Sequence, residues 1–141
     1  MEALKLSRGQ LDQMIAQARA DVPLETCGLL AGRGGHVTRV IPVPNVLHSR
    51  VAFRMGGQDL ADAMMACDFE PLAIYHSHPQ GPPVPSPTDV AESFYPDSIY
   101  VIISLGQDPP SVRAFRIVGG AVSEVEVQIS DLSESLELLG G

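Results

Sequence analysis

The sequence predicts a single α/β or α+β domain in which helices flank one mixed β-sheet. Segments with helical spacing alternate along the chain with apolar strands and hairpins, which is the pattern of such a sheet. The strongest strand signal, Ile99–Leu105, is apolar on both faces and indicates a central strand. The 141 residues, 45% hydrophobic and 18% charged, fit one globular domain. We expect it to span residues 1–141, with a core at 4–129 and a C-terminal tail at 130–141.

The first expected element is a helix over Leu4–Ala20. Leu11 and Ile15 lie on one apolar stripe, while polar residues occupy the positions between them. Ser7 has the side chain to cap the start of this helix. Pro23 ends the helix, because the residue before a proline is pushed out of the helical region.

The other elements follow from the same periodicities and from the glycines and prolines between them. Strands are expected at Cys27–Ala31, His36–Val43, Val51–Met55, Leu72–Tyr75, Ile99–Leu105, Ser111–Val118 and Ala121–Ile129. Helices are expected at Asp59–Cys67, Thr88–Phe94 and Leu132–Leu139. Four prolines within Gln80–Pro87 predict a loop there.

The charge and composition of the chain indicate which classes of binding partner to expect. The formal charge is −8, from 9 basic and 17 acidic residues, and no Lys/Arg cluster appears. We therefore expect neither nucleic acid nor an anionic membrane as a partner. No apolar run is long enough to cross a bilayer, and Met1–Gly9 lacks the apolar core of a secretion signal. Cys27 and Cys67 do not make a disulfide framework, so a cytoplasmic location is expected.

Two histidines and an aspartate form the main candidate site. His76 and His78 are one residue apart and project to the same side of an extended strand, which Pro79 then stops. Asp89 lies far enough along for the chain to turn back to the same point. Two imidazoles and a carboxylate leave a tetrahedral zinc with one open position, which is typical of catalytic zinc. The sequence therefore predicts a hydrolytic zinc centre.

Simpler interpretations compete with metal binding. His76 and His78 are also compatible with a pair of partly exposed residues at a strand end. Ser86-Pro87-Thr88-Asp89 is typical of a helix start, with serine at the N-cap, proline at the first position and an acid at the third. A cap fixes where the first turn points its side chains. We therefore expect Asp89 to act in the cap and as a ligand.

Glu25 has two possible interpretations. By default it is an exposed acid in a loop before an apolar strand. Hydrolysis of an amide by a zinc centre also needs a group that takes a proton from water and passes one to the leaving nitrogen. A glutamate near the metal but not bonded to it performs both steps. The residues alone leave both interpretations open.

Together these residues resemble the JAMM motif of MPN+ metallopeptidases, which is a glutamate, then H-[ST]-H-P, a spacer, a serine and an aspartate. Here Glu25 precedes His76-Ser77-His78-Pro79, six residues, and Ser86-Pro87-Thr88-Asp89. The resemblance covers about Leu4 to Ile129. It implies a single MPN domain with a curved mixed β-sheet flanked by helices, related to the fold of cytidine deaminases. No P-C-x-x-C follows the histidines, which disfavours deaminase chemistry.

The resemblance also implies a role for each matching residue. His76, His78 and Asp89 would hold one Zn²⁺ per chain. Glu25 would be the general base and then the general acid. Ser86 would donate a hydrogen bond to the oxyanion of the tetrahedral intermediate.

Segments such as Ile74–His78, Pro85–Val90 and Tyr100–Ser104 look like the short bacterial members of this family. Those members act on small ubiquitin-like sulfur-carrier proteins. The implied function is a zinc metallopeptidase or isopeptidase that cleaves the amide bond after a carrier's C-terminal Gly-Gly tail. Two alternatives stay open, a zinc hydrolase acting on another peptide and a non-catalytic MPN scaffold. The physiological substrate, the leaving residue and the oligomeric state do not follow from the sequence.

Two further features have a simple interpretation and a functional one. Cys27 is expected to be a small buried hydrophobe, yet it lies two residues from Glu25 and would there modulate the metal or sense oxidation. The chain ends Leu138-Leu139-Gly140-Gly141, which resembles the tail of a ubiquitin-like product. We expect an ordinary chain end, and the alternative is a product mimic that occupies the substrate groove.

Overall fold

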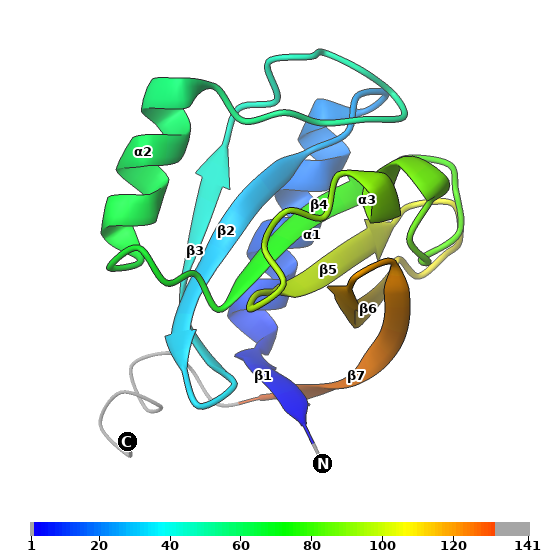
Figure 1. Ribbon diagram of the computed structural model, residues 1–141. Helices are drawn as coiled ribbons and strands as arrows, with labels where there is room; N and C mark the ends of the chain where they lie inside the picture. The colour runs from blue at the N-terminus through cyan, green and yellow to red at the C-terminus, as the bar shows by residue number, and fades with distance from the viewer. Residues whose placement is uncertain (1, 132–141) are drawn as a thin grey trace.

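The computed structural model describes residues 2–131, and within them seven strands close into one mixed barrel in the order β1-β3-β2-β4-β5-β6-β7 (Figure 1). The strands are β1 (Ala3–Ser7), β2 (Cys27–Arg33), β3 (His36–Val43), β4 (Ala73–His78), β5 (Ile99–Ser104), β6 (Ser111–Val118) and β7 (Ala121–Ser130). The helices are α1 (Arg8–Asp21), α2 (Gly57–Ala66) and α3 (Pro87–Ala91). The expected mixed sheet with flanking helices is confirmed, and it closes on itself.

The start of the chain corrects one prediction, because Ala3–Ser7 is a strand and not the first turn of a helix. Leu4 and Leu6 are both buried and alternate with Lys5, which is the period of a strand. This strand pairs in parallel with β7 along its whole length and with β3 at Lys5. It therefore closes the barrel. Ser7 caps α1 as expected, in a capping box with Gln10.

Smaller differences lie in the connections. Val51–Met55 is not a strand, and only Met55 makes an isolated bridge, to Asn45. The helix expected at Thr88–Phe94 ends at Ala91. The remaining strands and α2 occupy the expected segments within a few residues. The expected helix at Leu132–Leu139 and the final Gly-Gly lie outside the described residues.

Two hydrophobic clusters cover the two faces of the central strands, so α1 and α2 lie on opposite sides of β2 (Figure 1). The cluster around α1 takes Leu30, Tyr75 and Val101, and the cluster around α2 takes their neighbours Leu29, Ile74 and Ile102. Successive residues of one strand point to opposite faces, so β2, β4 and β5 are buried on both. His76 and His78 lie at the end of β4, and this strand is packed on both of its faces.

Cys27 and Cys67 are free and buried, as expected of small apolar side chains. The Cys27 Sγ lies 3.3 Å from the Val43 carbonyl oxygen, and burial raises the pKa of its thiol to about 12. A thiol with so high a pKa stays protonated near neutral pH, which disfavours a reactive role. No helix of residues 2–131 is long and apolar enough to cross a membrane.

Candidate metal centre

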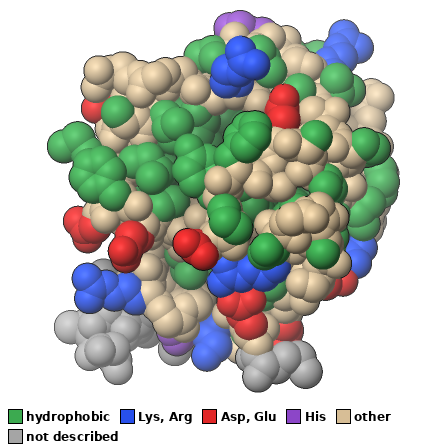
Figure 2. All heavy atoms as spheres, in the orientation of Figure 1, with side chains coloured by type: hydrophobic (Ala, Val, Ile, Leu, Met, Phe, Trp, Pro, Cys, Tyr) green, Lys and Arg blue, Asp and Glu red, His purple; other side chains and the backbone are tan. Residues whose placement is uncertain are grey.

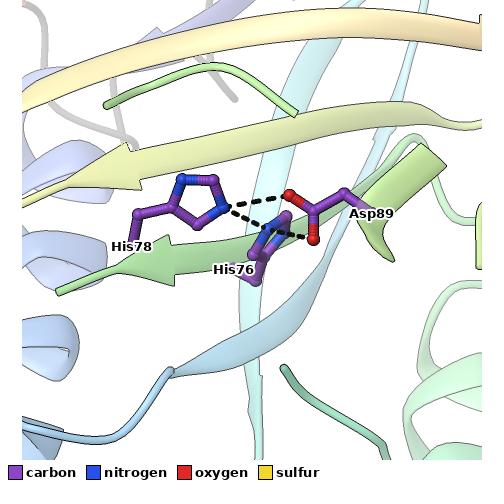
Figure 3. A group of neighbouring side chains, drawn as sticks. All are labelled: His76, His78 and Asp89. Atoms are coloured by element: carbon purple, nitrogen blue, oxygen red, sulfur yellow. Dashed lines mark hydrogen bonds and ion pairs between the residues drawn. The ribbon is translucent and has the colours of Figure 1, made fainter. Parts of the chain in front are cut away.

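Strand β4 brings two imidazoles to one point. His76 and His78 share the face of Ile74, which is the face that α2 covers. Asp89 approaches from α3, and one ligand atom from each of the three residues lies within 4.8 Å of the others (Figure 3). His76 Nε2 is 3.2 Å from Asp89 Oδ1, and His78 Nε2 is 3.0 Å from Asp89 Oδ2. The sequence prediction that these side chains converge is confirmed.

The helix cap and the convergence of ligands occur together at Asp89. The Ser86 Oγ accepts a hydrogen bond from the Asp89 amide at 3.1 Å, and Asp89 Oδ2 accepts one from the Ser86 amide at 2.9 Å. Pro87 begins the helix, where its missing N–H leaves no bond unmade. The capping box therefore fixes the carboxylate beside the histidines, as the sequence predicts.

The tautomer of His78 follows from its second nitrogen. Its Nδ1 lies 2.7 Å from the Pro82 carbonyl oxygen, which only accepts, so Nδ1 carries the proton and donates. In the neutral ring Nε2 is then a bare acceptor that faces the carboxylate of Asp89. His76 Nε2 is only 3.2 Å from His78 Nε2. Two acceptors, His78 Nε2 and the Asp89 carboxylate, thus face each other at 3.0 Å and need a proton or a cation between them, which fits a bound metal ion.

In the metal-free site, the pKa values of His78 and Asp89 are both shifted because these groups lie so close together. Burial acts to lower the pKa of His78, but the hydrogen bonds to Asp89 and Pro82 outweigh it and the net pKa is raised. Burial acts to raise the pKa of Asp89, but hydrogen bonds to His76 and His78 outweigh it and hold the net pKa far below its ordinary value. The raised pKa of His78 favours its protonated form, and a metal ion that binds at Nε2 has to compete with that proton.

The ring of Phe53 orients His76. The two rings stack with their centroids 4.8 Å apart and an interplanar angle of 24°. The Nδ1 of His76 is buried and has no hydrogen-bond partner among residues 2–131. A metal-ligating histidine is usually oriented by a hydrogen bond at its other nitrogen. Here aromatic packing supplies the orientation, and sequence reasoning missed it because Phe53 looked like an ordinary strand residue.

We expect Phe53→Leu to weaken binding of a divalent metal ion by about three- to tenfold, because aromatic stacking contributes about 0.5–1.5 kcal/mol. Competition with a chromogenic chelator measures this affinity directly. Phe69→Leu is the control, since Phe69 is 65% exposed and lies beyond the end of α2. Equal affinities in the two variants would show that the stacking does not hold His76.

Glu25 reaches the site through the register of β2 and β4. Cys27 pairs with His76, and the next pair is fixed by the Thr26 amide, which donates to Ser77 Oγ at 2.8 Å. Continuing this register places Glu25 opposite His78. The interpretation of Glu25 as an exposed loop acid is wrong, because only 3% of the residue is exposed.

The carboxyl group of Glu25 is unusually easy to protonate. Burial raises its pKa from 4.5 to about 8, against the attraction of His78 and with a further contribution from Asp89. Its Oε1 is buried and has no hydrogen-bond partner within the described part of the chain. A carboxyl group whose pKa is about 8, and which lies close enough to His78 and Asp89 for their charges to affect it, is suited to exchange protons during a reaction.

Two cavities meet at the triad. The first, here called the apolar cavity, has a volume of about 300 Å³ and reaches His76 and Asp89. Its other walls are mainly hydrophobic and include Leu29, Phe53, Met55, Leu60, Met64, Ile74, Phe94, Tyr95 and Tyr100. Figure 2 shows hydrophobic side chains gathered on this face of the molecule, where the surface is hollowed between α2 and α3.

The second cavity reaches the triad at His78 and has a volume of about 530 Å³. Glu25, His78 and Ser86 line its inner part. The proline-rich loop at 79–87 forms one wall, and Arg50 and Val51 contribute to another. The loop expected at Gln80–Pro87 therefore borders the site.

The chain is similar to several known proteins over most of its length. Residues 7–118 match the family described as prokaryotic homologs of the JAB domain. A CysO-cysteine peptidase of Mycobacterium tuberculosis is 40% identical over 126 residues, which cover 84% of this chain and 86% of the relative. A probable TtuB-protein conjugate cleaving protease of Thermus thermophilus is 42% identical over 121 residues, covering 83% and 78%. A solution structure of a protein from Desulfitobacterium hafniense has a TM-score of 0.83 and 34% identity, covering 94% and 96%.

Proposed function

The chain belongs to the family of prokaryotic homologs of the JAB domain and is a hydrolytic enzyme of the JAMM type, and from that premise we propose a zinc-dependent peptidase. Its substrate is a small ubiquitin-like or sulfur-carrier protein, cleaved at the amide bond after the C-terminal glycine. The observation that carries the proposal is the convergence of His76, His78 and Asp89 on one point with the buried carboxyl group of Glu25 beside them. The names of the two relatives support the substrate class.

Zinc fits the donor set. Two neutral imidazole nitrogens and one carboxylate oxygen are ligands that Zn²⁺ accepts, and they leave a position open for reaction. We assign the metal to His76 Nε2, His78 Nε2 and Asp89, one ion per chain. A bound zinc ion would polarise the scissile carbonyl group and lower the pKa of a water molecule at the site.

Glu25 performs the proton transfers in this proposal. Its carboxylate takes a proton from the attacking water, and the resulting carboxylic acid then protonates the leaving nitrogen. Burial favours the protonated form, which is the form that has to donate in the second step. The charge of a bound cation favours the ionised form needed in the first step. These opposed influences keep Glu25 close to the point where both steps are possible.

Ser86 stabilises the oxyanion. Its Oγ already accepts the hydrogen bond of the Asp89 amide, and its O–H has no acceptor among residues 2–131. The hydroxyl proton is therefore free to donate toward the oxygen of the scissile carbonyl as negative charge develops there. The same side chain thus holds the helix cap through its lone pair and serves the reaction through its proton.

We expect Ser86→Ala to lower kcat by about 10²–10³-fold, the usual loss when one oxyanion donor is removed. It also removes a helix cap, which lowers the free energy of unfolding by about 1 kcal/mol. Ser7→Ala is a matched control, because Ser7 makes the same capping box at α1. Steady-state kinetics and thermal unfolding should show both variants destabilised but only Ser86→Ala slowed. Similar kcat values in the two would contradict a role in the reaction.

The carrier's tail reaches the zinc through the apolar cavity. Strand β4, which carries the histidines, pairs with β2 on one side and with β5 on the other, so it offers the tail no free edge. Glycines at the end of the tail permit a close approach of its backbone to His76, which lines this cavity. Apolar residues before the glycines would then contact the walls of the apolar cavity.

The test is incubation with a Gly-Gly-ended carrier protein extended by one residue, followed by mass spectrometry. Zinc-loaded enzyme should release the unextended carrier, and Glu25→Gln should not. An intact carrier with both proteins would contradict the proposed substrate. Metal analysis in the same experiment separates a peptidase acting on another substrate, which holds zinc, from a scaffold that does not.

A further inference from the structure

The position of the proton donor indicates which side of the substrate each cavity would receive. Glu25 has to deliver a proton to the leaving nitrogen, and it is the only carboxylate among the residues that line this cavity. The carboxylates on the walls of the apolar cavity are Asp89, which belongs to the triad, and Glu92. The proton donor therefore assigns the acyl side of the substrate to the apolar cavity and the amine side to the second cavity.

Arg50 is the one cationic Lys/Arg side chain on the described wall of the second cavity. It is exposed, and within residues 2–131 it makes no ion pair or hydrogen bond. Two other arginines are held in ion pairs, Arg113 with Glu124 and Arg116 with Glu2. An unpaired guanidinium on the wall of a substrate cavity is available to bind an anion with two parallel hydrogen bonds.

The loop that carries Arg50 is tied to the backbone of Glu25. The Glu25 amide donates to the Ser49 carbonyl oxygen at 2.8 Å, and Asn45 Nδ2 donates to the Glu25 carbonyl oxygen at 3.1 Å. Asn45 also bonds the carbonyl oxygen of Ala52 at 3.0 Å and the amide of Arg54 at 3.0 Å. Arg50 therefore directly follows Ser49, whose carbonyl oxygen is bonded to the amide of the proton donor Glu25. Hydrogen bonds fix the loop on both sides of Arg50.

The chemistry of the leaving group suggests which anion this is. If the carrier is extended by a single amino acid, the leaving nitrogen is an α-amine and a free carboxylate lies two bonds away. If the carrier is joined to a lysine side chain, no carboxylate lies near the leaving nitrogen. The whole chain carries a formal charge of −8, so an anionic leaving group needs a local cation to bind.

We propose that Arg50 binds the free α-carboxylate of a single amino acid attached to the carrier, and so makes the enzyme prefer carriers extended by one residue over carriers joined to lysine. The inference rests on the proposed function and adds the class of leaving group to it. Arg50 is a specificity residue in this scheme, and the chemistry at the carbonyl group does not depend on it.

Three carrier substrates test the proposal: one extended by alanine with a free carboxylate, the same with a C-terminal carboxamide, and one joined to the Nζ of lysine. We expect the wild-type enzyme to have a kcat/KM about tenfold higher for the acid than for the carboxamide. Arg50→Gln should reduce kcat/KM for the acid to that of the carboxamide and leave the other two substrates unchanged. Arg50→Lys should restore part of the preference, because it keeps the charge without the paired donors.

Arg33→Gln is the control for the change in net charge, since Arg33 is exposed at the other end of β2. It should keep the wild-type ratio of acid to carboxamide. A ratio that is the same in Arg50→Gln and in wild type overturns the role of Arg50 while cleavage itself still supports the peptidase. Failure of zinc-loaded wild-type enzyme to cleave any of the three overturns the proposed function, and the role of Arg50 with it.

Discussion

Glu25→Gln is expected to lower kcat by about 10²–10⁴-fold, because the enzyme then lacks the group that moves protons in both steps. The amide has nearly the shape of the carboxylic acid and cannot take a proton from water. Binding of the metal ion should persist, since Glu25 is not one of the three converging ligands. Hydrolysis of a tail-extended carrier, followed by mass spectrometry, measures the loss. Glu70→Gln, an exposed acid before β4, is the control.

The same substitution should stabilise the metal-free protein near neutral pH. The pKa of Glu25 is 4.5 in ordinary surroundings and about 8 in the fold, so the folded state keeps a proton that the unfolded state releases. Wild-type stability therefore falls as pH rises from 4.5 to 8, and the glutamine variant lacks this loss. We expect Glu25→Gln to raise the free energy of unfolding by roughly 1–3 kcal/mol.

Urea titrations across this range test the sign. The difference between variant and wild type should be small in acid, grow through the range and become constant above it. A glutamine variant that is less stable than wild type at neutral pH would contradict the burial of an unpaired carboxyl group. Under the proposed mechanism, the wild-type protein thus keeps a group that lowers its stability because the reaction needs it.

The sequence predicts the convergence of His76, His78 and Asp89 because their spacing is local. His76 and His78 require only the alternation of a strand, and Asp89 requires only a helix cap at Ser86. Glu25 is different, because its position depends on how β2 pairs with β4. A shift of one residue in that register would turn its side chain to the other face, and nothing in the sequence near Glu25 fixes the register.

The closure of the sheet into a barrel was not predicted from the sequence, because the segment of β1 was expected to be helical. Leu4 and Leu6 of β1 are followed directly by the apolar stripe of α1. A single helical periodicity therefore fits both segments. Ser7 gives the better signal, since a residue that caps a helix excludes the residues before it from that helix. Pairing with β7, more than 100 residues away, then decides that the segment is a strand.

Asp89→Asn is expected to weaken metal binding by more than about 100-fold and to abolish turnover, since it removes the one negative charge among the ligands. The substitution is selective, because an amide oxygen still accepts the hydrogen bond of the Ser86 amide and keeps the cap of α3. Chelator competition measures the affinity, and far-ultraviolet circular dichroism checks the fold. Asp62→Asn, at an exposed position of α2, is the control.

The free energy of unfolding should change in opposite directions when Asp89 and Glu25 are replaced by their amides. Burial acts to raise the pKa of Asp89, yet hydrogen bonds to His76 and His78 hold it far below its ordinary value. Its ionised form therefore stabilises the metal-free fold at neutral pH, and that contribution fades as pH falls below the ordinary carboxyl range. Asp89→Asn should thus lower the free energy of unfolding where Glu25→Gln raises it. A shift of stability in the same direction in both variants would contradict these assignments. Asp89 would then not be an ionised ligand paired with imidazoles while Glu25 is a buried proton carrier.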